Sequence, residues 1–205
     1  MSDHTTPELL EFIRRWLPAS PARVVEVGCG DGALTRRLGE DGYGALGVDP
    51  EAPEGPRFVR STLEEFRPEV PFDAAVAIRS LHHLHDPAHA LDNLRALLEP
   101  GGRLVAFEFA VEHVDNAALN WLEAWGLAHP VQESNLDEVI PLADLRAGLE
   151  QRFHPLAAEP ASYLAREAGR EDLVADEEAA VRAGLIKPTG MRLAYERPRL
   201  LDAPR

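Results

Sequence analysis

The segment that most constrains the fold is a short apolar run that leads directly into a glycine-rich turn. Residues 24–27 are Val-Val-Glu-Val, and glycines follow at Gly28, Gly30 and Gly32. A β-branched run of this length is typical of a strand, and glycines after it let the backbone turn tightly and approach a ligand. Exposed N–H groups at the start of a following helix can hold a polar or anionic group. The segment therefore predicts a strand, a ligand-binding turn and a helix, in that order.

Short apolar runs alternate with helical patterns through the first half of the chain. Further strands are expected at residues 45–49, 58–60, 72–78 and 103–109, and between them leucines recur at helical spacing. Strands that alternate with helices predict an α/β fold, with a parallel sheet that helices cover on both faces. Two more strands are expected, at residues 153–156 and 190–196.

An acidic residue stands where a cofactor ribose would lie. Asp49 ends the second expected strand, 19 residues after Gly30. A carboxylate in this position can accept hydrogen bonds from both ribose hydroxyls. The glycine turn and Asp49 together predict a nucleoside cofactor across the carboxyl ends of the strands.

The same residues also satisfy the dinucleotide fingerprint, because Ala33 stands where its third glycine can be replaced. An oxidoreductase that uses NAD is therefore an alternative. Three features argue against it. No tyrosine is followed four residues later by lysine, little chain remains for a separate catalytic domain, and Glu26 occupies a strand position that is usually apolar in NAD enzymes.

The chain resembles the class I S-adenosylmethionine (SAM)-dependent methyltransferases in five ordered segments, over about residues 20 to 110. Glu26–Gly32 resembles motif I of that family, and Gly47-Val-Asp49 resembles its ribose-binding acid. Residues 58–66 stand in the place of its adenine-contacting segment. Residues 72–84 resemble its fourth strand and following turn, and residues 97–104 resemble its turn before strand five. The likeness is strongest to the small-molecule "type 11" group.

The resemblance implies a Rossmann-like class I methyltransferase fold, with a seven-stranded, mostly parallel sheet and an antiparallel last strand. It also implies one methyltransferase domain over residues 1–205. Within it we expect a cofactor-covering helix at 1–17, a SAM-binding core at 20–110, a helical substrate lid at 111–150 and completion of the sheet by 151–205.

The resemblance also assigns roles toward SAM and its product S-adenosylhomocysteine (SAH). The glycines of the turn would line the methionine end, and Glu26 would meet the ammonium group. Thr62 and Leu63 would flank the adenine, although many relatives carry Asp where this chain has Thr62. Arg79 follows the fourth strand beside the expected methyl position. The expected cofactor-binding residues are Glu26, Gly28, Gly30, Gly32, Asp49, Thr62, Leu63 and Arg79.

Histidines and aromatic residues supply the candidates for the acceptor side. His82 is the candidate general base for a hydroxyl acceptor. Residues expected to line the substrate site are His83, Glu108, Trp121 and Trp125. His85 and His89 have the four-residue spacing of paired helical metal ligands, but Pro87 lies between them, and no metal site is predicted.

Charge and composition bound the partners. The formal net charge of -14 disfavours nucleic acid and anionic membranes. The resemblance to the small-molecule group implies a small-molecule acceptor. One cysteine, no apolar run long enough to span a bilayer and no basic, then apolar, N-terminal stretch lead us to expect a cytoplasmic protein. A catalytically silent SAM-binding protein and a methyltransferase that acts on protein remain alternatives. The sequence does not identify the acceptor, the methylated atom or the oligomeric state.

Overall fold

The computed structural model describes residues 6–127 and 139–199. In this part of the chain, seven strands form one sheet: β1 (Arg23–Val27), β2 (Gly44–Asp49), β3 (Phe58–Arg60), β4 (Phe72–Ile78), β5 (Leu98–Phe109), β6 (His154–Ala161) and β7 (Gly190–Glu196). The α-helices are α1 (Pro7–Trp16), α2 (Ala33–Glu40), α3 (Pro87–Leu97), α4 (Asn116–Ala124), α6 (Leu142–Glu150), α7 (Leu164–Glu167) and α8 (Val174–Arg182). Single 3-10 turns are η1 (Leu81–His83), η2 (Val111–His113) and η4 (Glu171–Leu173).

The strand order is β3-β2-β1-β4-β5-β7-β6, and β7 alone runs in the opposite direction to the other six strands. This confirms the predicted seven-stranded, mostly parallel α/β sheet. The chain leaves β1 toward β2 on one side and later fills the other side with β4 and β5. The strand order therefore reverses beside β1, and ligands of such sheets bind outside the carboxyl ends of the strands at this point.

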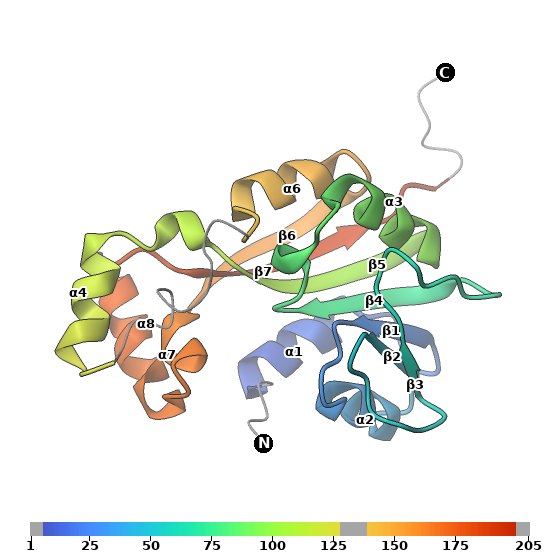
Figure 1. Ribbon diagram of the computed structural model, residues 1–205, viewed down its shortest axis with the longest axis horizontal. Coiled ribbons are helices and arrows are strands. Elements are labelled where there is room, and N and C mark those ends of the chain that lie inside the picture. The colour runs from blue at the N-terminus through green and yellow to red at the C-terminus, as the bar shows by residue number, and fades with distance from the viewer. Residues whose placement is uncertain (1–5, 128–138, 200–205) are drawn as a thin grey trace.

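Side chains that alternate along the strands build two hydrophobic layers, one on each face of the sheet. On β5, Leu104 and Ala106 pack with α3 and α6, whereas Val105 and Phe107 pack with α1 and α2. Figure 1 shows α3 and α6 above the sheet and α1 and α2 below it. Burial of each large apolar side chain stabilises this arrangement by roughly 1.5–3 kcal/mol.

Helix α1 begins as its sequence predicts. The Thr6 hydroxyl accepts a hydrogen bond from the backbone N–H of Leu9 at 3.3 Å, and Pro7 occupies the first turn. Leu9, Phe12 and Ile13 are buried on the face of the sheet that α2 also covers. That residues 1–17 cover a cofactor stays a prediction.

The sixth strand differs from its prediction. Residues 153–156 were expected, but β6 extends from His154 to Ala161 and includes Pro155 and Pro160. Proline cannot donate to a ladder, which is why this run does not look like a strand in the sequence. It is tolerated here because β6 is the edge strand of the sheet.

Helices follow β5, as expected for the segment 111–150, in two described parts. The first is α4, and the second is α6, which packs on α3 and on the sheet. Residues 128–138 of this segment lie outside the described residues. No described helix has the length and apolar character needed to cross a bilayer.

The chain from residue 162 to residue 189, which we call the β6–β7 segment, contains α7, η4 and α8. Because β6 and β5 are both antiparallel to β7, β6 ends at the same edge of the sheet as β1, β4 and β5. The β6–β7 segment therefore begins at the edge where the glycine turn lies.

Candidate functional site

The glycine turn is packed against the segment that follows β4. The backbone N–H of Gly28 donates to the Val48 carbonyl at 2.8 Å, and the Ser80 hydroxyl donates to the Val27 carbonyl at 2.9 Å. Gly28 has a φ of 73°, and a Cβ built on it would lie 2.3 Å from the Cβ of Ser80. Only glycine fits at this point, because a side chain would push β1 and the β4 turn apart.

The next glycine faces open space. Gly30 has a φ of 48°, and a Cβ built on it meets no atom within 4 Å. The space in front of the turn is the kind of cradle in which a ligand can approach the backbone closely.

Asp49 links the turn to the end of β2. Its Oδ2 accepts a hydrogen bond from the backbone N–H of Gly30 at 3.0 Å, and its Oδ1 accepts one from Glu51 at 2.8 Å. Each carboxylate oxygen has two lone pairs, so both oxygens can also accept from a pair of ligand hydroxyls. The geometry suits the vicinal hydroxyls of a ribose.

A cavity of about 340 Å³ opens beside these residues. This volume is in the range of small-molecule sites. Six of the residues that the sequence proposes lie in its wall: Gly28, Asp49, Thr62, Leu63, Arg79 and His83. The wall also contains apolar Val27, Val48 and Leu84, which suit the faces of a nucleobase. The polar and apolar lining residues and the volume of the cavity fit the adenosyl group of SAM.

Three residues of the predicted cofactor set do not belong to this wall. Gly30 lies at the turn, Gly32 is the N-cap of α2, and Glu26 is 5% exposed and accepts a hydrogen bond from the Thr35 hydroxyl on α2. Burial raises the pKa of Glu26 from 4.5 to about 7, against the lowering effect of the Thr35 hydrogen bonds. A contact of Glu26 with the cofactor ammonium stays a prediction.

The two adjacent histidines face different surroundings. His82 is 2% exposed and its Nδ1 lies 2.6 Å from Oε2 of the fully buried Glu108, whereas His83 lies in the cavity wall. Burial is the main reason that the pKa of His83 is lowered, with the neighbouring His82 as the next cause. Neither His82 nor Glu108 is among the residues that line the cavity. Their roles toward substrate stay predictions.

The two tryptophans lie on α4. Their ring centroids are 6.4 Å apart, Trp121 packs on the hydrophobic layer that contains α1, and Trp125 is 41% exposed. Neither residue lines the cavity beside Asp49. That they contact substrate stays a prediction.

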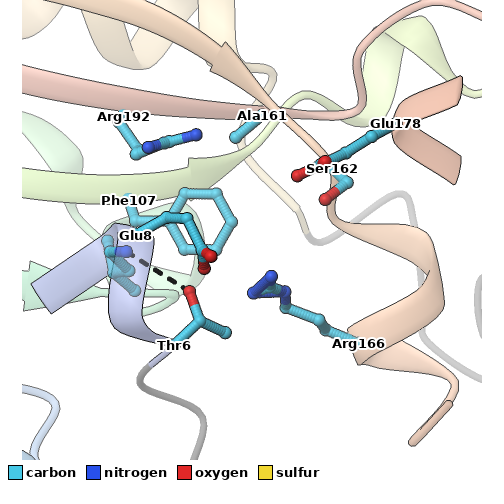
Figure 2. A pocket seen from close by; sticks show the side chains of 9 residues that line it. Thr6, Glu8, Phe107, Ala161, Ser162, Arg166, Glu178 and Arg192 are labelled. Carbon is cyan, nitrogen blue, oxygen red and sulfur yellow. Dashed lines mark hydrogen bonds between the residues drawn. The ribbon is translucent and has the colours of Figure 1, made fainter. Parts of the chain in front are cut away.

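Other hollows among the described residues are less suited to the cofactor. One of about 450 Å³, beside Pro18 and Pro100, contains neither the glycine turn nor Asp49. A larger one of about 630 Å³ lies between α3 and α6 and contains neither the glycine turn nor Asp49. Figure 2 shows a much smaller pocket between α1, α7, α8 and the sheet, with Glu8, Arg166, Glu178 and Arg192 turned toward it. Its volume of about 10 Å³ is enough for about one water molecule. We therefore place the site in the cavity beside Asp49.

Sequence reasoning missed two residues that support the cavity wall. Arg79 forms an ion pair with Glu167, and its guanidinium carbon lies 5.3 Å from the centroid of the Tyr163 ring. Both partners follow the carboxyl end of β6. A strand placed at 154–161 from the sequence would have pointed to them, because residues after parallel strands meet at one edge.

Comparison with known proteins agrees with this geometry. Residues 2–152 match the family described as "Methyltransferase domain". A ubiquinone biosynthesis O-methyltransferase of Xylella fastidiosa is 35% identical over an alignment of 114 residues, and the match covers 48% of this chain and 46% of the relative. The chain thus spans about half the length of the curated relatives that it matches.

Solved structures share the fold at low sequence identity. A SAM-dependent methyltransferase from Mesorhizobium loti has a TM-score of 0.63 at 19% identity, and the match covers 94% of this chain and 98% of that one. The N-methyltransferase NodS from Bradyrhizobium japonicum has a TM-score of 0.58 at 16% identity, with 95% and 89% covered. Together with the family match, the fold and the site geometry show that the chain belongs to the methyltransferase domain family, a class I family that uses S-adenosylmethionine.

Proposed function

We propose that this chain binds SAM at the carboxyl edge of its sheet and transfers the methyl group to an oxygen atom of a small molecule. The observation that carries the proposal is the position of Asp49, at the end of β2, in the wall of a cavity that also contains Gly28. A relative named as an O-methyltransferase supports oxygen as the methylated atom. A cytoplasmic location remains a prediction.

The residues of the chain would act mainly by binding and alignment. Asp49 would hold the ribose hydroxyls, Thr62 and Leu63 would flank the adenine, and the backbone of the glycine turn would face the methionine end. SAM itself supplies a reactive methyl group on a sulfonium. Positioning of an acceptor in line with such a group can lower the barrier by roughly 7–11 kcal/mol.

A hydroxyl acceptor must also lose a proton. His83 lines the cavity, and its lowered pKa keeps the imidazole neutral, and so able to accept a proton, to lower pH than usual. The alternative base from the sequence, His82, is 2% exposed and does not line the cavity. A base is unnecessary where the acceptor is already ionised.

Calorimetric titration with SAM, SAH and NAD tests the cofactor assignment. We expect the two adenosyl compounds to bind and Asp49→Ala to weaken both by about tenfold to a hundredfold, because two hydrogen bonds to a carboxylate are lost. Asp176→Ala, which removes an exposed carboxylate on α8, serves as the control. Binding of NAD alone, or an Asp49→Ala variant that binds SAH like the wild type, would contradict the proposal.

Turnover separates an enzyme from a silent SAM-binding protein. We expect the protein to convert SAM to SAH in the presence of some members of a panel of phenols, catechols and hydroxylated acids. SAM binding without SAH formation across phenols, amines and thiols would instead support the binding protein.

A further inference from the structure

Arg79 has an unusual backbone at the edge of the cavity. It follows β4 directly, and with a φ of 58° it is the one residue other than glycine in the described ranges with a positive φ. Residues that carry a side chain rarely adopt this backbone conformation, so an arginine at this position indicates a functional role for its side chain. Its backbone N–H is held by the Phe107 carbonyl at 2.7 Å.

The Arg79 guanidinium is held by two residues of the β6–β7 segment. Glu167 forms the ion pair, and the ring of Tyr163 lies against the guanidinium. Tyr163 is itself fixed, because it is 3% exposed and stacks on Phe109 with ring centroids 4.5 Å apart. The guanidinium therefore has a defined position on the wall of the cavity.

A buried carboxylate fixes the start of the β6–β7 segment in turn. Glu177 on α8 is fully buried, and its oxygens accept hydrogen bonds from three successive backbone N–H groups, of Tyr163 (2.9 Å), Leu164 (3.1 Å) and Ala165 (2.8 Å). It also accepts one from the Thr189 hydroxyl at 3.1 Å, just before β7. Glu177 thus ties both ends of the segment together.

Charge is distributed unevenly along the cavity. Asp49 and Glu64 line the part that β2 and β3 form, whereas Arg79 lies on the other side of β1, at the end of β4. Among the lining residues Arg79 alone has a permanently charged cationic group. An anion in the cavity would therefore meet a guanidinium on the β4 side only, and that guanidinium is also paired with Glu167.

Two described side chains that contact the Arg79 guanidinium, those of Glu167 and Tyr163, lie outside the region shared with the family. The family match ends at residue 152, while Tyr163, Glu167 and Glu177 come later in the chain. The cofactor is common to the family, so residues that serve it are expected within the shared region. A guanidinium held from outside that region suits the acceptor, which differs between family members.

We propose that Arg79, held by Glu167 and Tyr163, binds a carboxylate on the methyl acceptor. This proposal rests on the proposed function, because the acceptor is the molecule that would receive the methyl group. A guanidinium pairs with a carboxylate through two parallel hydrogen bonds, which gives orientation as well as affinity. Arg79 is thus a specificity-determining residue for acidic acceptors.

Benzoate and benzamide are matched probes of this proposal, because they differ in charge and hardly in shape. We expect the SAH-saturated wild type to bind benzoate about tenfold more tightly than benzamide in calorimetric titrations. Arg79→Asn should bring the ratio close to one, and asparagine tolerates the left-handed backbone that this position needs. Arg79→Lys, a second variant that keeps the charge without the planar fork, should retain part of the preference.

Arg182→Asn is the control, since it removes an arginine that is 69% exposed on α8, and it should leave the ratio unchanged. Equal binding of benzoate and benzamide to the wild type, or a preference that persists in Arg79→Asn, would overturn the proposal. So would a loss of SAH affinity in Arg79→Asn without loss of affinity for 5′-methylthioadenosine, which places Arg79 on the carboxylate of the cofactor. The two probes are also titrated without SAH. A failure of SAH to bind, which would overturn the proposed function, is then seen separately from a failure of Arg79 to distinguish the probes.

Discussion

His82 and Glu108 form a buried pair in which Nδ1 of the imidazole lies 2.6 Å from Oε2 of the carboxylate. The other oxygen of Glu108 accepts hydrogen bonds from the backbone N–H groups of Ser80 (3.3 Å) and Leu81 (3.0 Å). One carboxylate on β5 therefore fixes the whole turn that leaves β4. Arg79 and His83 lie in that turn and line the cavity, so the buried His82–Glu108 pair helps to position them.

Removal of this carboxylate should destabilise the protein strongly. We expect Glu108→Ala to lower the free energy of unfolding by about 3 to 5 kcal/mol, because it leaves the imidazole and two backbone donors buried without their acceptor. Urea denaturation measures the change. Glu99→Ala removes an exposed carboxylate from the same strand and should change stability by about 0.5 kcal/mol or less. Similar values for the two variants would show that the pair is not needed.

Glu177 and Glu178 offer a second matched comparison, on adjacent positions of α8. Glu177 accepts three backbone hydrogen bonds, whereas Glu178 forms an exposed ion pair with Arg182 at 3.6 Å. Glu177→Ala should cost about 3 kcal/mol or more, and Glu178→Ala about 0.5 kcal/mol. Hydrogen exchange should show faster exchange of the Tyr163 to Ala165 amides in the first variant only. Unchanged exchange there would contradict the proposed role of Glu177.

The two glycines of the turn should respond differently to alanine. Gly28→Ala should lower the free energy of unfolding by about 2 kcal/mol or more, because the new methyl group meets Ser80. Gly30→Ala has open space, so it should cost about 1 kcal/mol of backbone strain and yet weaken SAH binding.

Gly184→Ala provides the control for this pair. Gly184 has a φ of 69° and also faces open space, but it lies after α8, away from the cavity. Its alanine variant should show similar strain and normal SAH affinity. A Gly30→Ala variant with unchanged SAH affinity would mean that the cofactor does not lie against the turn.

Glu26 should make stability depend on pH. Its pKa is 4.5 ordinarily and about 7 in the folded protein, chiefly because it is buried. Between these values the unfolded chain has released the proton and the folded protein keeps it, so the stabilisation present below pH 4.5 is lost as pH rises through 7. Relative to Glu26→Gln, the wild type should lose about 3 kcal/mol of unfolding free energy between pH 4 and pH 8.

Denaturant titrations at several pH values measure this difference. Glu69→Gln, at an exposed position, should show the same pH dependence as the wild type. If the curves of Glu26→Gln and the wild type run parallel from pH 4 to pH 8, the raised pKa is wrong.

The sequence by itself determined the half of the site that depends on neighbours along the chain. The turn from Gly28 to Gly32 follows β1, and Asp49 is the last residue of β2. The residues of each of these strands predict the strand without reference to the rest of the chain. Parallel strands bring such ends to one edge, and the cavity indeed has Gly28, Asp49 and Thr62 in its wall. The parallel direction of the central strands follows from the same alternation of strand and helix.

Only the tertiary structure decided which side chains meet across the chain. Arg79 and Glu167 are 88 residues apart, and no periodicity relates them. Their contact depends on the length of β6. That length is hard to predict from the sequence, because β6 contains two prolines, which are tolerated only because it is an edge strand. His82 and His83 likewise cannot be told apart by composition. The carboxylate of Glu108, on a neighbouring strand, buries the first, and the turn that it fixes leaves the second on the cavity wall.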